Sequence, residues 1–290
     1  MNDRVAIQRE AVRRSLQLRR SLSIPREFSV NVFDIAISLG VEVQFMDLPS
    51  LEGMFYRGPN PKVILPSFKH RPRGRVAFTC AHELGHFDLG HGTRVDEYVE
   101  NEDGCRRQHS IEELAADAFA ASLLMPRPAV LSRFLAHGWK VATASPVELY
   151  RAATELDVGY ATLCNHMRFG LELVDDAWLK SLLKFSPKQL REMIAPNCDC
   201  TRLLIIDEHW PSVPIDLEVG ECLQISAALN AQLPQLVVED VGNNDWSIYR
   251  AAAVGESKAK IAGREFVIRI SRAGFCGLLK YRYLEEGDVE

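Results

Sequence analysis

Five consecutive residues, His82-Glu83-Leu84-Gly85-His86, carry the side chains that metal-dependent hydrolysis requires. On an α-helix, His82 and His86 stand one above the other on the same face, so both imidazoles can reach one Zn²⁺ ion. Glu83 points about a quarter turn away and is poorly placed to be a third ligand. Its carboxylate can instead hydrogen-bond a water molecule on the metal, which is the position of a general base. The sequence therefore predicts a metal-dependent hydrolase with Glu83 as its catalytic residue.

A catalytic zinc ion also needs a third protein ligand and an open coordination position. Glu113 lies on the next predicted helix, and Asp117 follows one turn later on the same face. Asp117 is an isolated acid on an otherwise apolar helix, so it needs a buried partner. The free ring N–H of a ligating histidine would be such a partner. We therefore expect His82, His86 and Glu113 to bind the metal, with Asp117 behind one histidine.

Some assignments at this site stay open. Ser110-Ile-Glu-Glu113 also fits a capping box, in which the Glu113 side chain bonds back to the Ser110 backbone. In that case Glu112 or His109 would have to complete the metal site. His91 misses the spacing of a third histidine ligand by one residue and follows Gly90, where the helix is expected to end, so it is not expected to bind the metal. Candidates for a donor to the oxyanion are Tyr56, Tyr98 and His91.

Hydrophobic periodicity indicates the elements that position these side chains. An apolar stripe predicts a helix over about 74–90 with the histidines on a separate face. A second helix is expected over 110–125, ended by Pro126 and Pro128. Upstream we expect a helix at 31–40, a strand at 41–45 and a hairpin of 53–57 with 62–65. The strand at 62–65 could hold an extended substrate by strand addition if it borders the cleft.

The types of element predicted along the chain change twice, which predicts an α+β multidomain protein. The expected domains are residues 1–127, 128–170 and 171–290. The middle segment contains only predicted helices, and two of them, 146–156 and 161–168, flank a short turn with a glycine, which is the helix-turn-helix outline. The last segment is expected to be mixed α/β, with a helical stretch inside 221–233. Its predicted strands are 203–206, 235–238, 247–254, 265–270 and 278–284.

The motif at 82–86, followed by Leu89-Gly90-His91 and by the block from Glu113 to Pro126 with its Phe-Ala-Ala-Ser-Leu-Leu-Met-Pro ending, resembles the ImmA/IrrE family of metallopeptidases. The resemblance covers roughly residues 20–170. It implies a soluble, zincin-like (minigluzincin) peptidase domain with ligands at His82, His86 and Glu113 and the base at Glu83. Asp117 stands where many relatives carry Asn, and we expect it to keep its role behind a histidine.

The same resemblance implies a function and a substrate. The substrate would be a helix-turn-helix transcriptional repressor, whose cleavage derepresses DNA-repair genes after radiation or desiccation. The metal would be Zn²⁺, with Mn²⁺ as a second possibility. Residues 171–290 would form a GAF-like sensor domain that binds a small-molecule signal.

Composition excludes several classes of protein. The 290 residues are 47% hydrophobic and 25% charged, as in an ordinary soluble globular protein. The net charge of −5 argues against a protein that coats nucleic acid. No run of 18 apolar residues and no secretory signal is present, so no membrane association is expected. The seven scattered cysteines favour a reducing, cytoplasmic environment over a disulfide framework.

Two rival functions remain. The first is a DNA-binding transcription regulator with a structural metal site, but residues 128–170 hold four Lys and Arg against three Asp and Glu, too few for phosphate neutralisation. The second is a signal-sensing adaptor built on the C-terminal domain, where Cys198-Asp-Cys200 is a weak hint of metal or redox chemistry. The six arginines within residues 1–20 are interpreted as a solvated helix face rather than a site for an anionic partner.

Overall fold

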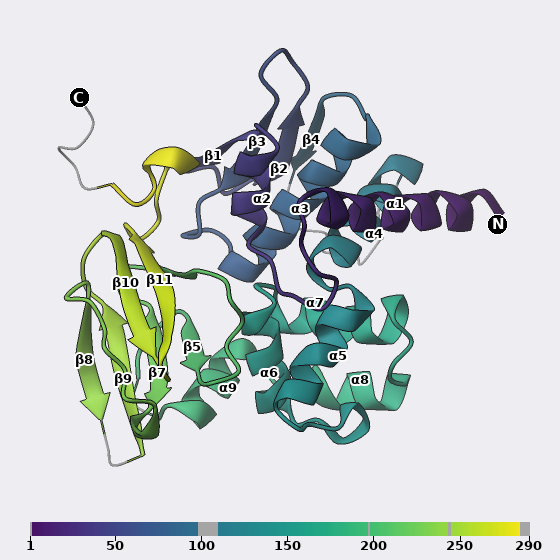
Figure 1. The fold of residues 1–290 in the computed structure, drawn as a ribbon. Helices are drawn as coiled ribbons and strands as arrows, with labels where there is room; N and C mark the ends of the chain where they lie inside the picture. The colour runs from purple at the N-terminus through teal and green to yellow at the C-terminus, as the bar shows by residue number, and fades with distance from the viewer. Residues whose placement is uncertain (1, 98–109, 197, 243–244, 285–290) are drawn as a thin grey trace. The chain divides into compact units, whose positions relative to one another are not determined.

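The computed structural model describes residues 2–97, 110–196, 198–242 and 245–284 (Figure 1). The chain forms two compact units. Unit 1 contains Met1–Leu131 together with the short segments Leu156–Gly159 and Cys276–Leu279, and unit 2 contains Ser132–Glu155, Tyr160–Phe275 and Lys280–Glu290. The division into domains at 1–127, 128–170 and 171–290 stays a prediction.

Unit 1 is built on a five-stranded sheet with the order β12-β1-β3-β2-β4. β1 and β3 are parallel, whereas β2 is antiparallel to both β3 and β4. Because β3 lies between β1 and β2, both of its edges are already hydrogen-bonded. The prediction that this strand could accept a substrate by strand addition is therefore wrong. The strands are β1 (Glu42–Met46), β2 (Leu51–Tyr56), β3 (Lys62–Pro66), β4 (Arg94–Glu97) and β12 (Gly277–Leu278).

Two helices of unit 1 carry the predicted site. α3 (Arg73–Leu89) packs against β2 and β3 and against α4 (Ile111–Leu124). α3 ends at Gly90, whose φ of +80° is the left-handed conformation that favours glycine. α2 (Val32–Ser38) begins after Asn31, whose side chain accepts hydrogen bonds from the backbone of the first turn. The helices predicted over 31–40, 74–90 and 110–125 are confirmed.

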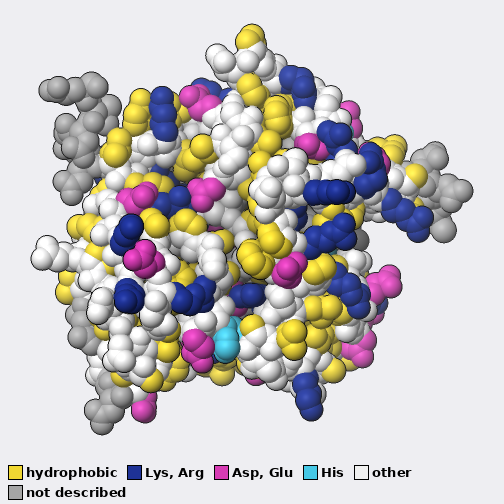
Figure 2. All heavy atoms as spheres, in the orientation of Figure 1, with side chains coloured by type: hydrophobic (Ala, Val, Ile, Leu, Met, Phe, Trp, Pro, Cys, Tyr) yellow, Lys and Arg dark blue, Asp and Glu magenta, His cyan; other side chains and the backbone are white. Residues whose placement is uncertain are grey.

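The N-terminal helix α1 (Asn2–Ser21) packs against α4. Arg19 is fully buried and donates hydrogen bonds to the carbonyl oxygens of Leu123 (2.6 Å) and Pro25 (2.8 Å). Burial lowers the pKa of Arg19 to about 10. The interpretation of the arginines as a solvated face is thus wrong for Arg19. Figure 2 shows Lys and Arg side chains gathered in the region of α1, and the exposed arginines of this helix are Arg4, Arg9, Arg13 and Arg20.

Unit 2 combines helices with two sheets, and the chain enters it within α5 (Arg127–Ala136). Its helices are α6 (Pro146–Glu155), α7 (Tyr160–Asn165), α8 (Asp176–Leu182) and α9 (Pro187–Ile194). The three-stranded sheet has the order β10-β11-β6, with β6 (Ile215–Glu218), β10 (Gly255–Ile261) and β11 (Arg264–Ser271). The four-stranded sheet has the order β5-β7-β9-β8, with β5 (Leu203–Ile206), β7 (Cys222–Ser226), β8 (Val237–Gly242) and β9 (Trp246–Ala251).

Two sequence predictions in unit 2 and at its end are wrong. The stretch expected to be helical inside 221–233 contains β7, in which the first four residues are all buried, followed only by a short 3₁₀ turn at Ala227–Leu229. A short buried apolar run carries no period that separates a central strand from a helix. The strand expected over 278–284 is limited to β12, which is followed by the 3₁₀ turn Leu279–Tyr281.

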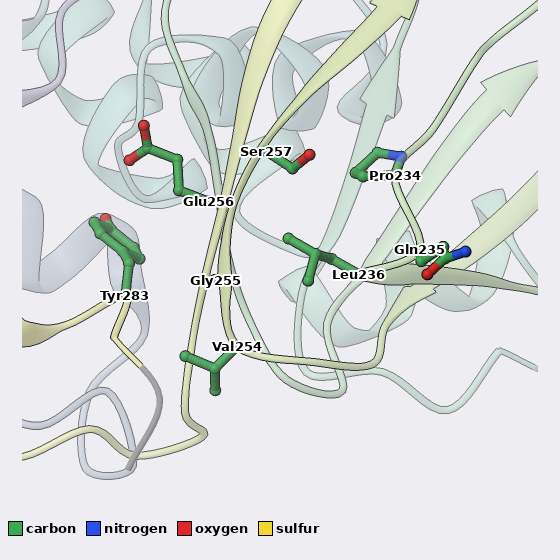
Figure 3. A pocket seen from close by; sticks show the side chains of 8 residues that line it. All are labelled: Pro234, Gln235, Leu236, Val254, Gly255, Glu256, Ser257 and Tyr283. Carbon is green, nitrogen blue, oxygen red and sulfur yellow. The ribbon is translucent and has the colours of Figure 1, made fainter. Parts of the chain in front are cut away.

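Unit 2 also has a pocket of about 580 Å³ beside the start of β10 (Figure 3). Apolar Leu236 and Val254 line it together with Glu256, Ser257 and Tyr283. The small-molecule signal expected in the C-terminal part of the chain stays a prediction.

Among the described residues, the stretch Ile111–Ala136 is long and apolar enough to cross a membrane, and 61% of the window that meets this criterion is buried inside the structure. The stretch includes α4 and α5. Buried core helices of globular proteins meet the same criterion by length and composition.

Candidate metal centre

Side chains from α3 and α4 converge on one point. The Nε2 atoms of His82 and His86 lie 3.1 Å apart. The carboxylate of Glu113 lies 3.1 Å from Nε2 of His82 and 3.5 Å from Nε2 of His86. One ligand atom from each of the three residues lies within 4.8 Å of the others. The structure thus brings together the three residues that the sequence analysis selected as metal ligands.

The small size of Gly85 lets the two helices approach this closely. A Cβ atom added to Gly85 would lie 3.2 Å from Cα of Ala116 and 3.3 Å from Cβ of Phe119. Almost any larger side chain there would push α4 away from α3. Gly85 therefore belongs to the site, because it keeps Glu113 within reach of the two histidines.

The outer ring nitrogens of both histidines are engaged. Asp117 Oδ1 lies 2.9 Å from Nδ1 of His82, and Nδ1 of His91 lies 2.8 Å from Nδ1 of His86. With the Nδ1 atoms bonded on the outside, the Nε2 atoms are presented to the common point, as metal-binding histidines require. Two imidazoles and one carboxylate are a donor set that suits Zn²⁺. The residues present therefore fit a divalent metal ion.

Only half of the capping box expected at Glu113 is formed. Its backbone N–H donates to Oγ of Ser110 (3.2 Å), which caps the start of α4. Its carboxylate is directed to the histidines instead of back to the Ser110 backbone, so the cap and the ligand do not compete. Glu112 is not part of the cluster. His109, a candidate ligand, and Tyr98, a candidate donor to the oxyanion, lie outside the described residues.

Glu83 is completely buried beside the sheet, where a glycine makes room for it. A Cβ atom on Gly53 of β2 would lie only 2.4 Å from Oε1 of Glu83 and 2.5 Å from Cγ2 of Thr79. The backbone of β2 therefore forms one wall of the space that holds the Glu83 carboxylate. Any larger side chain at position 53 would require the Glu83 carboxylate, the Thr79 methyl group or the strand to move.

Carboxylates on α4 set the electrostatics of His82. Burial lowers the pKa of His82, but its hydrogen bonds to Asp117 and Glu113 outweigh burial and raise the pKa to about 10. The same contacts with His82 and His86 hold the pKa of Glu113 well below its usual range. The ring of His82 is thus hydrogen-bonded to two carboxylates of α4, those of Glu113 and Asp117.

Sequence reasoning missed two residues of the site. His91, proposed only as a donor to the oxyanion, bonds the ring of His86 instead. Arg57 was not selected at all, yet its guanidinium donates to the carbonyl oxygens of Phe87 (2.9 Å) and His91 (2.5 Å) at the end of α3. The contact joins β2 to the end of α3 across 30 or more positions, so no local pattern could reveal it. Tyr56 is 44% exposed and lines a different pocket.

A glycine substitution tests the close approach at Glu83. In Gly53→Ala, the new methyl group must displace the Glu83 carboxylate or the strand. Because a misplacement of about 1 Å at a catalytic group can reduce rates about 100-fold, we expect the metal-dependent hydrolase activity predicted from the sequence to fall by roughly that factor while metal content is unchanged. Gly92→Ala is the matched control, since a Cβ there meets nothing within 4 Å. Equal activity of the two variants would show that Gly53 does not position Glu83.

Comparison with known proteins places the site inside a recognised domain. Residues 36–168 match the family described as the IrrE N-terminal-like domain. The chain is also 38% identical over 99 residues to the radiation response metalloprotease IrrE of Deinococcus radiodurans. That alignment covers 33% of this chain and 29% of the relative, so it spans under a third of the relative's length. His82, Glu83, His86 and Glu113 all lie within the matched domain. Residues 36–168, which carry the site, are thus similar to the IrrE N-terminal-like domain.

Proposed function

We propose that this protein is a metal-dependent endopeptidase that cleaves a helix-turn-helix transcriptional repressor and so derepresses DNA-damage response genes. The observation that carries the peptidase role is the convergence of His82, His86 and Glu113 on one point, with the buried Glu83 on the adjacent turn of α3. The match of residues 36–168 to the IrrE N-terminal-like domain supports a metallopeptidase. The repressor substrate is supported by the family resemblance, and the stress response also by the name of the Deinococcus relative. We also propose a cytoplasmic location, where such a repressor would act.

In the proposed reaction, His82, His86 and Glu113 hold the metal ion, Zn²⁺ or Mn²⁺. When bound, this ion supplies Lewis acidity, which lowers the pKa of a water molecule and polarises the scissile carbonyl. The Glu83 carboxylate accepts a proton from the attacking water and then delivers it to the nitrogen of the leaving amine. Asp117 and His91 keep the two imidazole rings in the orientation that ligation requires.

The edge of the sheet offers a place for an extended substrate. β4 stands at the end of the strand order and, among the described strands, pairs only with β2. Its outer backbone edge can therefore accept a peptide as an additional strand. β2 carries Gly53 beside Glu83, so a peptide on β4 would lie one strand away from the strand that positions the base. This replaces β3 as the proposed docking strand.

Incubation of the full-length protein with candidate repressors tests the proposed function. We expect cleavage of a repressor in the presence of Zn²⁺ or Mn²⁺, loss of cleavage with a chelator, and recovery when metal is added back. Mass spectrometry of the products locates the cleaved bond. Cleavage that continues in excess chelator would exclude the metal-dependent mechanism. Absence of cleavage for every repressor, combined with cleavage of an unstructured protein, would retain the peptidase and reject the substrate class.

A further inference from the structure

Three cysteine side chains come together in unit 2, far from the His82–Glu113 centre in the sequence. Cys198 and Cys200 lie in the segment between α9 and β5, and Cys222 is the first residue of β7. The Sγ atoms of Cys198 and Cys222 are 3.6 Å apart, and all three Sγ atoms lie within 4.8 Å of one another. None of the three is in a disulfide. The partner that Cys198-Asp-Cys200 lacks in the sequence is thus supplied by the fold.

Strand pairing and packing fix this arrangement. β5 and β7 are parallel, with Leu203 opposite Cys222, so the chain just before β5 lies beside the start of β7. Cys200 and Cys222 are buried in a small apolar cluster with Leu203 and Ile248, and Cys198 packs against the same cluster. Cys198 is only partly buried. The cluster therefore holds the thiols in place while one of them remains accessible to a metal ion from solvent.

Two arginine guanidinium groups lie beside the backbone of this cluster. Arg191 donates to the carbonyl oxygen of Cys200 (3.0 Å), and Arg250 donates to the carbonyl oxygens of Asp199 (3.2 Å) and Gly220 (3.0 Å). A group of three thiolates with one divalent cation would carry a net charge of about −1, which the arginines would offset.

We propose that Cys198, Cys200 and Cys222 form a second metal site, which binds a thiophilic cation of the Zn²⁺ type. Thiolates are the ligands that such soft metal ions prefer, and three cysteines leave a fourth position for water or another donor. Binding releases the thiol protons and ties the segment after α9 to the central strand β7. The site differs in chemistry from the His82–Glu113 centre, which has no sulfur ligand.

A third cluster in unit 2 shows why the cysteines are the better candidate. His137 lies 2.8 Å from the carboxylate of Glu155 and 3.5 Å from that of Asp207. The two acids there also form ion pairs with Arg133 (3.6 Å) and Arg151. Fixed cations already neutralise those carboxylates, so an added metal ion would be repelled. The thiols, by contrast, have exchangeable protons that a metal ion can displace.

Cobalt spectroscopy on the full-length, reduced protein tests the proposal. Added Co²⁺ should produce the near-ultraviolet charge-transfer absorption of cobalt bound to thiolate, and added Zn²⁺ should remove it. The His82–Glu113 centre cannot give this band without sulfur. Metal analysis should find one Zn²⁺ ion fewer per chain in Cys198→Ser and in Cys200→Ser than in the unmodified protein. Cys276→Ser, which removes an exposed thiol, is the matched control and should change neither measurement.

Each result of these measurements either supports the cysteine metal site or overturns it. Because Cys198 is partly exposed, Cys198→Ser should keep its circular dichroism spectrum, and loss of the cobalt band in that folded variant supports the site. The proposal is overturned if the reduced protein shows no thiolate band, or if the band and zinc content survive in both Cys198→Ser and Cys200→Ser. It is also overturned if Cys198 and Cys222 form a disulfide that resists reductant and no zinc binds.

Discussion

Glu83→Gln is expected to slow the proposed repressor cleavage severely while leaving the metal ion bound. The amide has almost the same size as the carboxylate, so it fits the space beside Gly53, but it cannot accept a proton from water. General acid–base catalysis contributes about 10²–10⁴-fold to a rate, and we expect a loss of that size in kcat. The measurements are single-turnover cleavage of the repressor and metal content of the purified variant.

Two comparisons make this result specific. Glu192→Gln on α9 changes a glutamate whose side chain is 62% exposed, and its activity should match that of the unmodified protein. Full activity of Glu83→Gln would remove this residue from the reaction. Loss of the metal together with activity would show instead that Glu83 maintains the metal centre, a role that its buried position beside His82 does not by itself require.

Removal of Glu113 should have the largest effect on metal binding. Glu113→Ala deletes one of three predicted ligands and leaves two histidines. The cap of α4 should survive, because Ser110 bonds the backbone N–H of residue 113 and not its side chain. We expect zinc affinity to fall by more than the roughly 10–100-fold that loss of an outer hydrogen-bond partner causes, and cleavage to disappear with it.

Zinc affinity is measured by titration against a competing chelator. Two further variants give reference values for the effect of Glu113→Ala. Asp117→Ala removes the hydrogen bond behind His82 and should weaken zinc binding by about 10–100-fold. Glu112→Ala removes a neighbouring carboxylate on the same turn and should leave the affinity unchanged. If Glu112→Ala lost zinc and Glu113→Ala kept it, the third ligand would have to be reassigned.

Local spacing was sufficient to select the ligand candidates, because helical periodicity alone places His82 above His86 and Asp117 one turn beyond Glu113. The isolated acid on an apolar helix correctly indicated a partner, which the structure shows to be His82. Sequence could not reveal contacts that depend on the order of strands. Whether β3 is central or at an edge is decided by which strands pair with it, and the hairpin signal at 53–65 specifies only one of its neighbours.

The order of strands also explains the other contacts that the sequence analysis did not predict. Arg57 reaches the end of α3 because β2 lies beside that helix, and Cys222 meets Cys198 because β5 and β7 pair in parallel. Neither neighbour is close in the sequence. Where the sequence prediction failed at β7, the strand is short and buried on both faces over its first residues, so it lacks the alternation that marks a strand with one exposed face.

The buried Arg19 has a practical consequence for anyone who shortens this protein. The matched domain begins at residue 36, but the guanidinium of Arg19 bonds the carbonyl oxygen of Leu123 near the end of α4, the helix that also carries Glu113 and Asp117. A truncated chain that starts at the domain boundary would expose that helix along the face which α1 covers. The smallest fragment that keeps this helix covered must therefore retain an N-terminal extension that lies outside the matched range of residues 36–168.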